Sequence, residues 1–266
     1  MIIADAAARL AGTPVSGVQA VHGGDLSAVW RLDLADGARM IAKQGALVAT
    51  EASMLKAMAA TDAPVPAVID CEGDLLLMEW IDSDGGPGQA WDELAQVLAC
   101  LHGAQGGSYG WAEDYAFGEV TIANAPADDW PTFWAERRLL PFIADLPAGL
   151  GARIEELARA LPDLLPRQPC ASLLHGDLWG GNVLSSGTRV AALIDPACYH
   201  GDREVDAAML TLFDHPPTRF FDALDLDAGW RERQPAYRLW PLLVHLRLFG
   251  GHYRRGVEAC LSELGH

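Results

Sequence analysis

Basic residues are scarce in this chain of 266 residues. It contains 19 Lys and Arg against 36 Asp and Glu, which gives a formal net charge of −17. No run of Lys or Arg offers a local exception, and such a chain repels a phosphate backbone. We therefore expect no nucleic-acid partner. We interpret the acidity mainly as a source of solubility, although an acidic surface also favours cationic substrates.

The sequence also predicts no disulfide framework, no signal peptide and no membrane-spanning segment. Its five cysteines are widely spaced and include no Cys-x-x-Cys, which is typical of reduced thiols rather than of disulfides or a zinc site. The start carries Asp5 and no basic stretch before an apolar one. The apolar region 239–249 is interrupted by Pro241, His245 and Arg247, so it is too short and too polar to span a bilayer. We expect a cytoplasmic protein with no membrane partner, and a monomer by default.

The N-terminal part of the sequence predicts mainly β structure. Strands are expected over 15–22 and 28–34, and Asp36-Gly37 then forms a tight hairpin into a third strand that contains Lys43. A helix is expected over 50–61, with Thr50 as N-cap and Glu51 in the first turn. A second hairpin, turned at 72–74, completes a predicted five-stranded sheet with one inserted helix.

The pattern of apolar residues changes after Ile81. The segment DSDGGPGQ is a polar, glycine-rich break, and apolar residues recur at helical spacing from Trp91 onward. A short β region over 171–195 interrupts these helices. The pattern predicts an α+β fold with two lobes: a small β-rich lobe over residues 1–81 and a larger, mostly helical lobe over 82–266, joined by a hinge near 80–88.

The segment LLHGDLWGGNVL, followed by RVAALIDPA, carries the chemistry. Asp177 leaves a short strand, Asn182 comes five residues later, and Asp195 comes thirteen residues after the asparagine. Phosphoryl transfer needs a carboxylate near the attacking hydroxyl and oxygen ligands that hold Mg²⁺ against the phosphates. Carboxylate and amide oxygens are hard donors that suit Mg²⁺. The spacing therefore indicates a phosphotransferase.

These motifs resemble those of a known family. His-Gly-Asp followed by Asn is similar to the catalytic loop of the kinase-like phosphotransferases, which include aminoglycoside and choline kinases. Leu-Trp-Gly-Gly-Asn and the continuation IDPACYHGDREVDAAML resemble the fructosamine (ketosamine) kinase family. The resemblance extends over almost the whole chain, including GGDLSAVWRL and WPTFWAERRL. It implies a bilobal protein-kinase-like fold that uses ATP and Mg²⁺ to phosphorylate a ketosamine, a sugar attached through an amine, on its 3-hydroxyl for deglycation repair.

The resemblance also implies roles for individual residues. Asp177 would be the catalytic base, and Asn182 and Asp195 would bind magnesium. Lys43 would contact the α- and β-phosphates and would be held by an ion pair with Glu51. Without this context, Lys43 fits equally well as a lysine that faces solvent. Glu51 fits equally well as an acidic residue that stabilises the first turn of a helix.

The nucleotide itself would be bound by a glycine loop and by the hinge. The backbone at Gly23, Gly24 and Ser27 would approach the phosphates. Adenine would bind at the hinge, between apolar side chains, through residues that include Met78, the Glu79 carbonyl and the Ile81 amide. Several family members carry a cysteine in the glycine loop where this chain has Asp25, so a redox switch on that thiol is not expected. The region between Gly106 and Asp129 is short, and we expect it to shape the substrate entrance.

Other candidate residues have structural interpretations. We expect His175 to buttress the catalytic loop and Trp134 to lie in the core, whereas Trp179 has two open alternatives, contact with substrate or packing. The Gly-x-Ser-x-Gly match at 106–110 follows a helix rather than a strand, which argues against a hydrolase elbow.

Two alternative functions follow from the same motifs. One is a kinase for another small alcohol such as an aminoglycoside, and the other is an inactive ATP-binding pseudokinase. An inactive pseudokinase is expected to have lost at least one of the residues that bind phosphate, bind metal or accept the proton. This chain retains all four of them, which disfavours the pseudokinase: Lys43, Asp177, Asn182 and Asp195.

Overall fold

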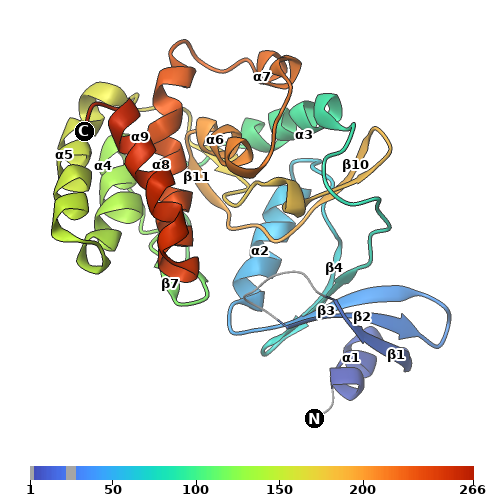
Figure 1. Ribbon diagram of the computed structural model, residues 1–266. Coiled ribbons are helices and arrows are strands. Elements are labelled where there is room, and N and C mark those ends of the chain that lie inside the picture. Colours follow the sequence, from blue (N-terminus) through green and yellow to red (C-terminus); the bar gives the residue numbers. More distant parts are fainter. Residues whose placement is uncertain (1–2, 22–27) are drawn as a thin grey trace.

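The computed structural model describes residues 3–21 and 28–266, which form two lobes (Figure 1). The N-lobe is built on a five-stranded antiparallel sheet with strand order β1-β2-β3-β5-β4. Its strands are β1 (Val15–Ala20), β2 (Ala28–Leu34), β3 (Arg39–Gln44), β4 (Val68–Glu72) and β5 (Leu75–Glu79). The predicted sheet is therefore confirmed.

Strand β5 shows why this sheet has a helix on each face. Successive side chains of a strand point to opposite faces. Leu75 and Leu77 are buried with helix α1 (Ile3–Ala11), whereas Leu76 and Met78 are buried with helix α2 (Val48–Ala59). The unbroken apolar run LLLM is thus a central strand, covered on both sides.

The larger lobe is mostly helical, as predicted. Its longer helices are α3 (Trp91–Gly103), α5 (Ala148–Leu164), α6 (Glu204–Phe213), α8 (Trp230–Phe249) and α9 (Arg254–Glu263), with the short α4 (Trp130–Phe133) and α7 (Thr218–Leu224). A π-helical segment, Trp134–Leu139, and a 3₁₀ segment, Leu140–Asp145, continue α4. The core of this lobe combines buried leucines with large aromatic residues, which include Trp130, Trp134, Tyr199 and Tyr237. The prediction that Trp134 is a core residue is confirmed.

Three antiparallel strand pairs are set into the helical lobe. They are β9 (Val183–Ser186) with β10 (Arg189–Leu193), β8 (Ser172–Leu174) with β11 (Tyr199–Gly201), and β6 (Tyr115–Phe117) with β7 (Val120–Ile122). Strands β8, β9 and β10 lie in the predicted β region, whereas β11 lies beyond it and was not predicted. The catalytic motif lies on the connections between these strands. The β6–β7 hairpin was not predicted.

Several predicted boundaries were wrong. Helix α2 begins at Val48 rather than Thr50, and Thr50 is not its N-cap, because Leu47 occupies that position. Helix α1 was not predicted. Helix α8 begins at Trp230 rather than at Tyr237. Its buried apolar contacts outweigh the loss of the backbone hydrogen bond that Pro235, which has no N–H, cannot donate. The lobe boundary after Ile81 lies between β5 and α3 and stays a prediction.

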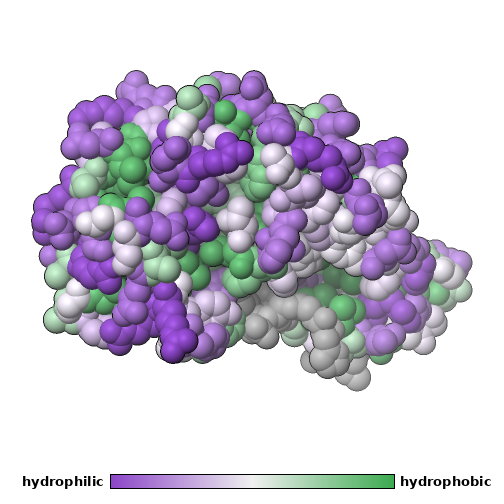
Figure 2. Space-filling model, turned by 45° about the horizontal axis from the view of Figure 1, so that its top comes forward, coloured by the Kyte–Doolittle hydropathy of each residue, from purple (hydrophilic) through white to green (hydrophobic). Residues whose placement is uncertain are grey.

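Hydrophilic side chains cover most of the face shown in Figure 2, and apolar side chains appear between them in smaller patches. Among the described residues, no helix is long and apolar enough to cross a membrane.

Candidate active site

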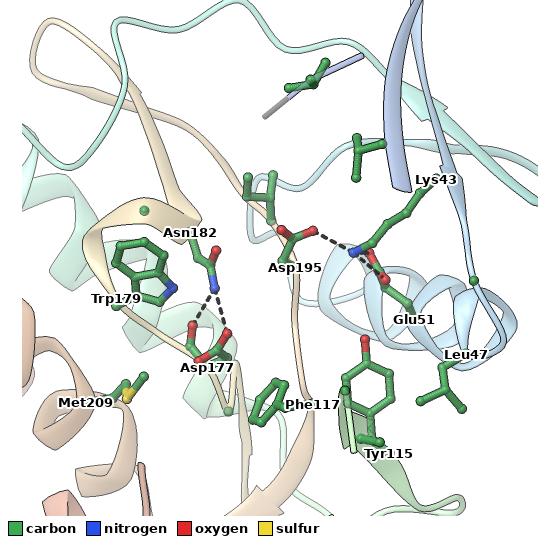
Figure 3. A pocket seen from close by; sticks show the side chains of 18 of the residues that line it. Lys43, Leu47, Glu51, Tyr115, Phe117, Asp177, Trp179, Asn182, Asp195 and Met209 are labelled. Atoms are coloured by element: carbon green, nitrogen blue, oxygen red, sulfur yellow. Dashed lines mark hydrogen bonds and ion pairs between the residues drawn. The ribbon is translucent and has the colours of Figure 1, made fainter. Parts of the chain in front are cut away.

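A cleft of about 1150 Å³ lies where the two lobes meet. The N-lobe contributes β2, β3, α2 and the end of β5 to its walls. The larger lobe contributes the catalytic motif, the β6–β7 hairpin and parts of α6 and α8. Figure 3 shows the middle of this cleft, where these predicted site residues come together: Lys43, Glu51, Asp177, Trp179, Asn182 and Asp195.

The catalytic loop leaves β8 at His175 and is held by buried hydrogen bonds. His175 is fully buried, and its Nε2 lies 3.0 Å from the Ile194 carbonyl oxygen. Gly176 has a φ of 80°, and a side chain there would collide with the Ala197 carbonyl, so this position requires glycine. His175 therefore buttresses the loop, as predicted.

Asp206 of α6 is the main anchor of this loop. Its carboxylate accepts bonds from the backbone N–H groups of His175, at 2.9 Å, and Gly176, at 3.0 Å, and lies 2.9 Å from His102 Nε2. Burial acts to raise the pKa of Asp206, but the hydrogen bond with His102 and the bond from the Gly176 N–H outweigh it and hold the pKa below its usual value. The carboxylate therefore stays ionised in the fold.

We expect Asp206→Asn to lower the free energy of unfolding by about 3 kcal/mol, because an amide group would face N–H donors in a buried site. For a chain of this size the midpoint of thermal unfolding should fall by roughly 5 °C. The Asp206 carboxylate contributes its stabilisation to the wild-type protein at neutral pH. This contribution to the free energy of unfolding is lost as the pH falls through the lowered pKa of Asp206. Thermal unfolding of this variant beside the exposed Asp163→Asn tests the assignment. Equal midpoints would contradict it.

Asp177 and Asn182 are directly bonded. Asn182 Nδ2 donates to the Asp177 backbone oxygen at 2.8 Å and to Asp177 Oδ2 at 3.1 Å. Burial, together with the charge of Asp195, raises the pKa of Asp177 to about 7, although the bond from Asn182 acts in the opposite direction. A carboxylate with a pKa near neutrality is matched to general-base work.

Asp195 provides the second set of oxygen donors. It follows β10 with a φ of 53°, a left-handed conformation that is uncommon for a residue with a side chain and is often found at functional sites. The Ile194 N–H donates to the Asn182 carbonyl at 3.0 Å, which ties the two loops together. Because Asn182 Nδ2 is used by Asp177, its Oδ1 is turned toward Asp195 (Figure 3). The Asp195 carboxylate and the Asn182 amide oxygen are hard donors that fit Mg²⁺. Elsewhere, too, the described residues contain no cluster of three or more His, Cys, Asp or Glu able to hold a metal.

Lys43 on β3 joins the two lobes electrostatically. Its Nζ lies 2.7 Å from Glu51 Oε2 on α2 and 2.9 Å from Asp195 Oδ1. Burial acts to lower the pKa of Lys43, but the carboxylates of Asp195 and Glu51 outweigh it and raise the pKa above its usual value. The predicted Lys43–Glu51 pair is therefore present, and a charged ammonium lies at the centre of the cleft.

The remaining predicted residues line the two ends of the cleft. Met78, Glu79 and Ile81 lie at the end of β5 and just beyond it. Trp179 lies at the opposite end, where the residue is 40% exposed and its ring centroid is 6.2 Å from that of Phe213. The structure thus places Trp179 in the cleft with a free face. The predicted phosphate-binding residues Gly23, Gly24 and Ser27 lie outside the described residues.

The sequence interpretation missed the side chains that the β6–β7 hairpin brings into the cleft. Tyr115 directs its hydroxyl toward Glu51, and Phe117 lies beside Asp177 (Figure 3). Tyr115 and Phe117 alternate before the turn at Gly118, which has a φ of 55°, but three residues are too few for this alternation to predict a strand.

Comparisons with known proteins agree on one family. A sequence model described as fructosamine kinase matches residues 2–265. A Synechocystis protein named as a probable ketoamine kinase is 36% identical over 239 residues, which cover 84% of this chain and 80% of that protein. A crystal structure assigned as a fructosamine-3-kinase from Thermobifida fusca superimposes with a TM-score of 0.90 at 33% identity, covering 99% of this chain and 98% of that one. A spectinomycin phosphotransferase solved with ADP and spectinomycin shares the fold, with a TM-score of 0.62 at 14% identity over 99% and 92% of the two chains.

Proposed function

This chain belongs to the fructosamine kinase family, and we propose that it transfers the γ-phosphate of ATP to the 3-hydroxyl of a ketosamine. The observation that carries the proposal is the convergence of three functions in one cleft. A carboxylate of raised pKa, Asp177, lies beside the oxygen donors of Asn182 and Asp195, and these lie beside the ammonium of Lys43. Catalysis of phosphoryl transfer depends mainly on such positioning and charge stabilisation.

ATP would occupy the N-lobe side of this cleft. Adenine would bind against the end of β5, through Glu79 and Ile81, with Met78 on one face. Lys43 would hold the α- and β-phosphates, and Gly23, Gly24 and Ser27 would complete the phosphate site. Asn182 and Asp195 would hold Mg²⁺, which when bound neutralises charge on the phosphates. The spectinomycin phosphotransferase of the same fold, solved with ADP, supports this use of a nucleotide.

The ketosamine would occupy the opposite side, against α6 and α8. Trp179, Met209, Phe213 and His245 line that wall, and the Phe213 and His245 rings are 5.0 Å apart. An aromatic face packs against the C–H face of a sugar and attracts the ammonium that links it to its carrier. Asp177 would accept the proton of the sugar 3-hydroxyl. The resulting 3-phosphate is prone to eliminate and release the amine, so the cellular role would be deglycation repair.

Trp179→Ala should raise the KM for a ketosamine about tenfold and leave the KM for ATP unchanged, because the indole would contact only the sugar side. Trp179→Phe retains an aromatic face and should lose much less. Steady-state kinetics with each substrate varied in turn measure both values. An unchanged KM for the ketosamine in Trp179→Ala would assign this side chain to packing instead.

The proposal is tested by measuring ADP release from MgATP against a panel of acceptors: a fructosamine, a ribulosamine, an aminoglycoside and choline. Turnover restricted to the two ketosamines supports the proposal and ranks the sugars. Turnover restricted to the aminoglycoside or choline would retain the phosphotransferase mechanism and refute the ketosamine substrate. Omission of Mg²⁺ should abolish turnover, since Asn182 and Asp195 would then present no metal to the phosphates.

A further inference from the structure

Helix α2 is held by both lobes. Leu55 packs against Leu76 in the N-lobe sheet, whereas Met54 and Met58 are buried with the core of the larger lobe. Because α2 also carries Glu51, any contact that fixes this helix also fixes the partner of Lys43.

One polar contact between the lobes lies directly beside Glu51. Thr50 is 8% exposed, and its Oγ1 donates to Glu113 Oε2 at 2.8 Å. Glu113 belongs to the larger lobe, two residues before strand β6. A hydrogen bond to an ionised carboxylate is stronger than one between neutral groups, and this bond ties the first turn of α2 to the segment that leads into the β6–β7 hairpin.

That segment is itself held by Asn124, which is 1% exposed. The Asn124 side chain donates from Nδ2 to the Glu113 carbonyl at 3.1 Å, and its backbone N–H donates to Asp114 Oδ1 at 2.7 Å. Its Oδ1 accepts from Arg138 Nη2 at 2.8 Å. The two ends of the hairpin are therefore bonded to each other and to Arg138.

Arg138 is a fully buried cation in the π-helical segment. Within residues 3–21 and 28–266, no carboxylate lies within ion-pair distance of it. Its guanidinium lies 4.8, 4.2 and 4.9 Å from the ring centroids of Phe133, Tyr199 and Trp240, and Nη1 donates to the Ala123 carbonyl at 2.6 Å. Burying a cation without a directly paired carboxylate is costly, and the more distant charge of Asp114 offsets part of that cost. The guanidinium provides contacts that an apolar residue could not make. Here its donors are directed at the base of the hairpin.

We propose that Arg138, Asn124 and Glu113 form a relay that holds Thr50, and through α2 holds Glu51 where it orients Lys43. The relay runs from the core of the larger lobe to the centre of the cleft. Its members are positioning residues, since Glu51 and Lys43 stand between them and the nucleotide. The effect on catalysis rests on the proposed function, in which Lys43 binds phosphates.

The experiment that tests the relay compares Thr50→Val with Thr61→Val. Valine has nearly the shape of threonine, so Thr50→Val removes the bond to Glu113 and little else. Thr61 lies just past the end of the same helix, and its hydroxyl donates locally to the Met58 carbonyl at 2.7 Å. We expect kcat/KM for ATP to fall about tenfold in Thr50→Val and by less than twofold in Thr61→Val.

A double-mutant cycle separates positioning from general destabilisation. If Thr50 acts through Glu51, the tenfold effect of Thr50→Val should disappear in a Glu51→Ala background. An equal effect in both backgrounds, or a loss in Thr61→Val as large as that in Thr50→Val, would overturn the relay.

Hydrogen exchange of the α2 amides tests the relay without turnover. Thr50→Val should accelerate exchange in α2 about tenfold, and Thr61→Val should leave the first turn unchanged. Unchanged exchange in Thr50→Val would refute the relay whatever the kinetics show. Faster exchange together with a wild-type protein that transfers no phosphate would support the relay and refute the proposed function.

Discussion

Replacing Asp177 by Asn should reduce kcat by about 10²–10⁴-fold while leaving nucleotide binding nearly intact. The amide has the size of the carboxylate but cannot accept the proton of the attacking hydroxyl. Asp177 is also bonded to Asn182 rather than to Lys43, so its replacement leaves the Lys43–Glu51–Asp195 contacts in place. ADP release with a ketosamine measures kcat, and titration with MgATP measures the affinity for nucleotide.

Asp222→Asn is the matched control, because this carboxylate is exposed on α7, away from the cleft. It should leave both quantities unchanged. Near-normal turnover in Asp177→Asn would contradict the assignment of Asp177 as the base. A large loss of nucleotide affinity in that variant would show instead that Asp177 mainly shapes the nucleotide site.

Replacing Lys43 by Met should reduce kcat/KM for ATP by about 10²–10³-fold, the range seen when one preorganised charge-stabilising donor is removed. Methionine keeps the apolar stem and removes the ammonium. Glu51 and Asp195 would then face each other without the cation that now lies between them, at 2.7 and 2.9 Å from their oxygens. Both the affinity for ATP and the rate of transfer should fall, since Lys43 would contact phosphates in the ground state and in the transition state.

The only other lysine in the chain provides the control for this change. Lys56 is exposed on the same helix as Glu51, so Lys56→Met removes one positive charge of the same kind without touching the cleft. We expect less than a twofold effect on kcat/KM. Similar losses in the two variants would show that overall charge, rather than the position of Lys43, governs activity.

The parts of the site that could be predicted lie on short sequence segments with fixed spacing. Asp177 and Asn182 are five residues apart on one loop, so local backbone geometry brings them together. Asp195 follows the next hairpin, and a two-stranded hairpin necessarily returns its end to its beginning. Lys43 lies 152 residues from Asp195, and its place in the cleft depended on the family resemblance rather than on any local pattern.

The parts that could not be predicted depend on contacts between distant segments. Strands β6 and β7 have three residues each, which is too short for a reliable alternating pattern. Thr50 has the side chain of an N-cap, but its hydroxyl bonds to Glu113, 63 residues away. Arg138 sits in a helical segment whose sequence gives no sign that the guanidinium would be enclosed by three aromatic rings.

If this cleft phosphorylates the sugar of a ketosamine, identification of the product shows it without an intermediate step. Purified protein would be incubated with MgATP and a ribulosamine or fructosamine, and the phosphorus and carbon spectra of the sugar recorded by nuclear magnetic resonance. We expect one new phosphate ester on the 3-carbon, formed by the wild type and not by Asp177→Asn over the same period. ATP consumption that yields neither a sugar phosphate nor the amine released from it, or an ester formed equally by both proteins, would contradict this proposal.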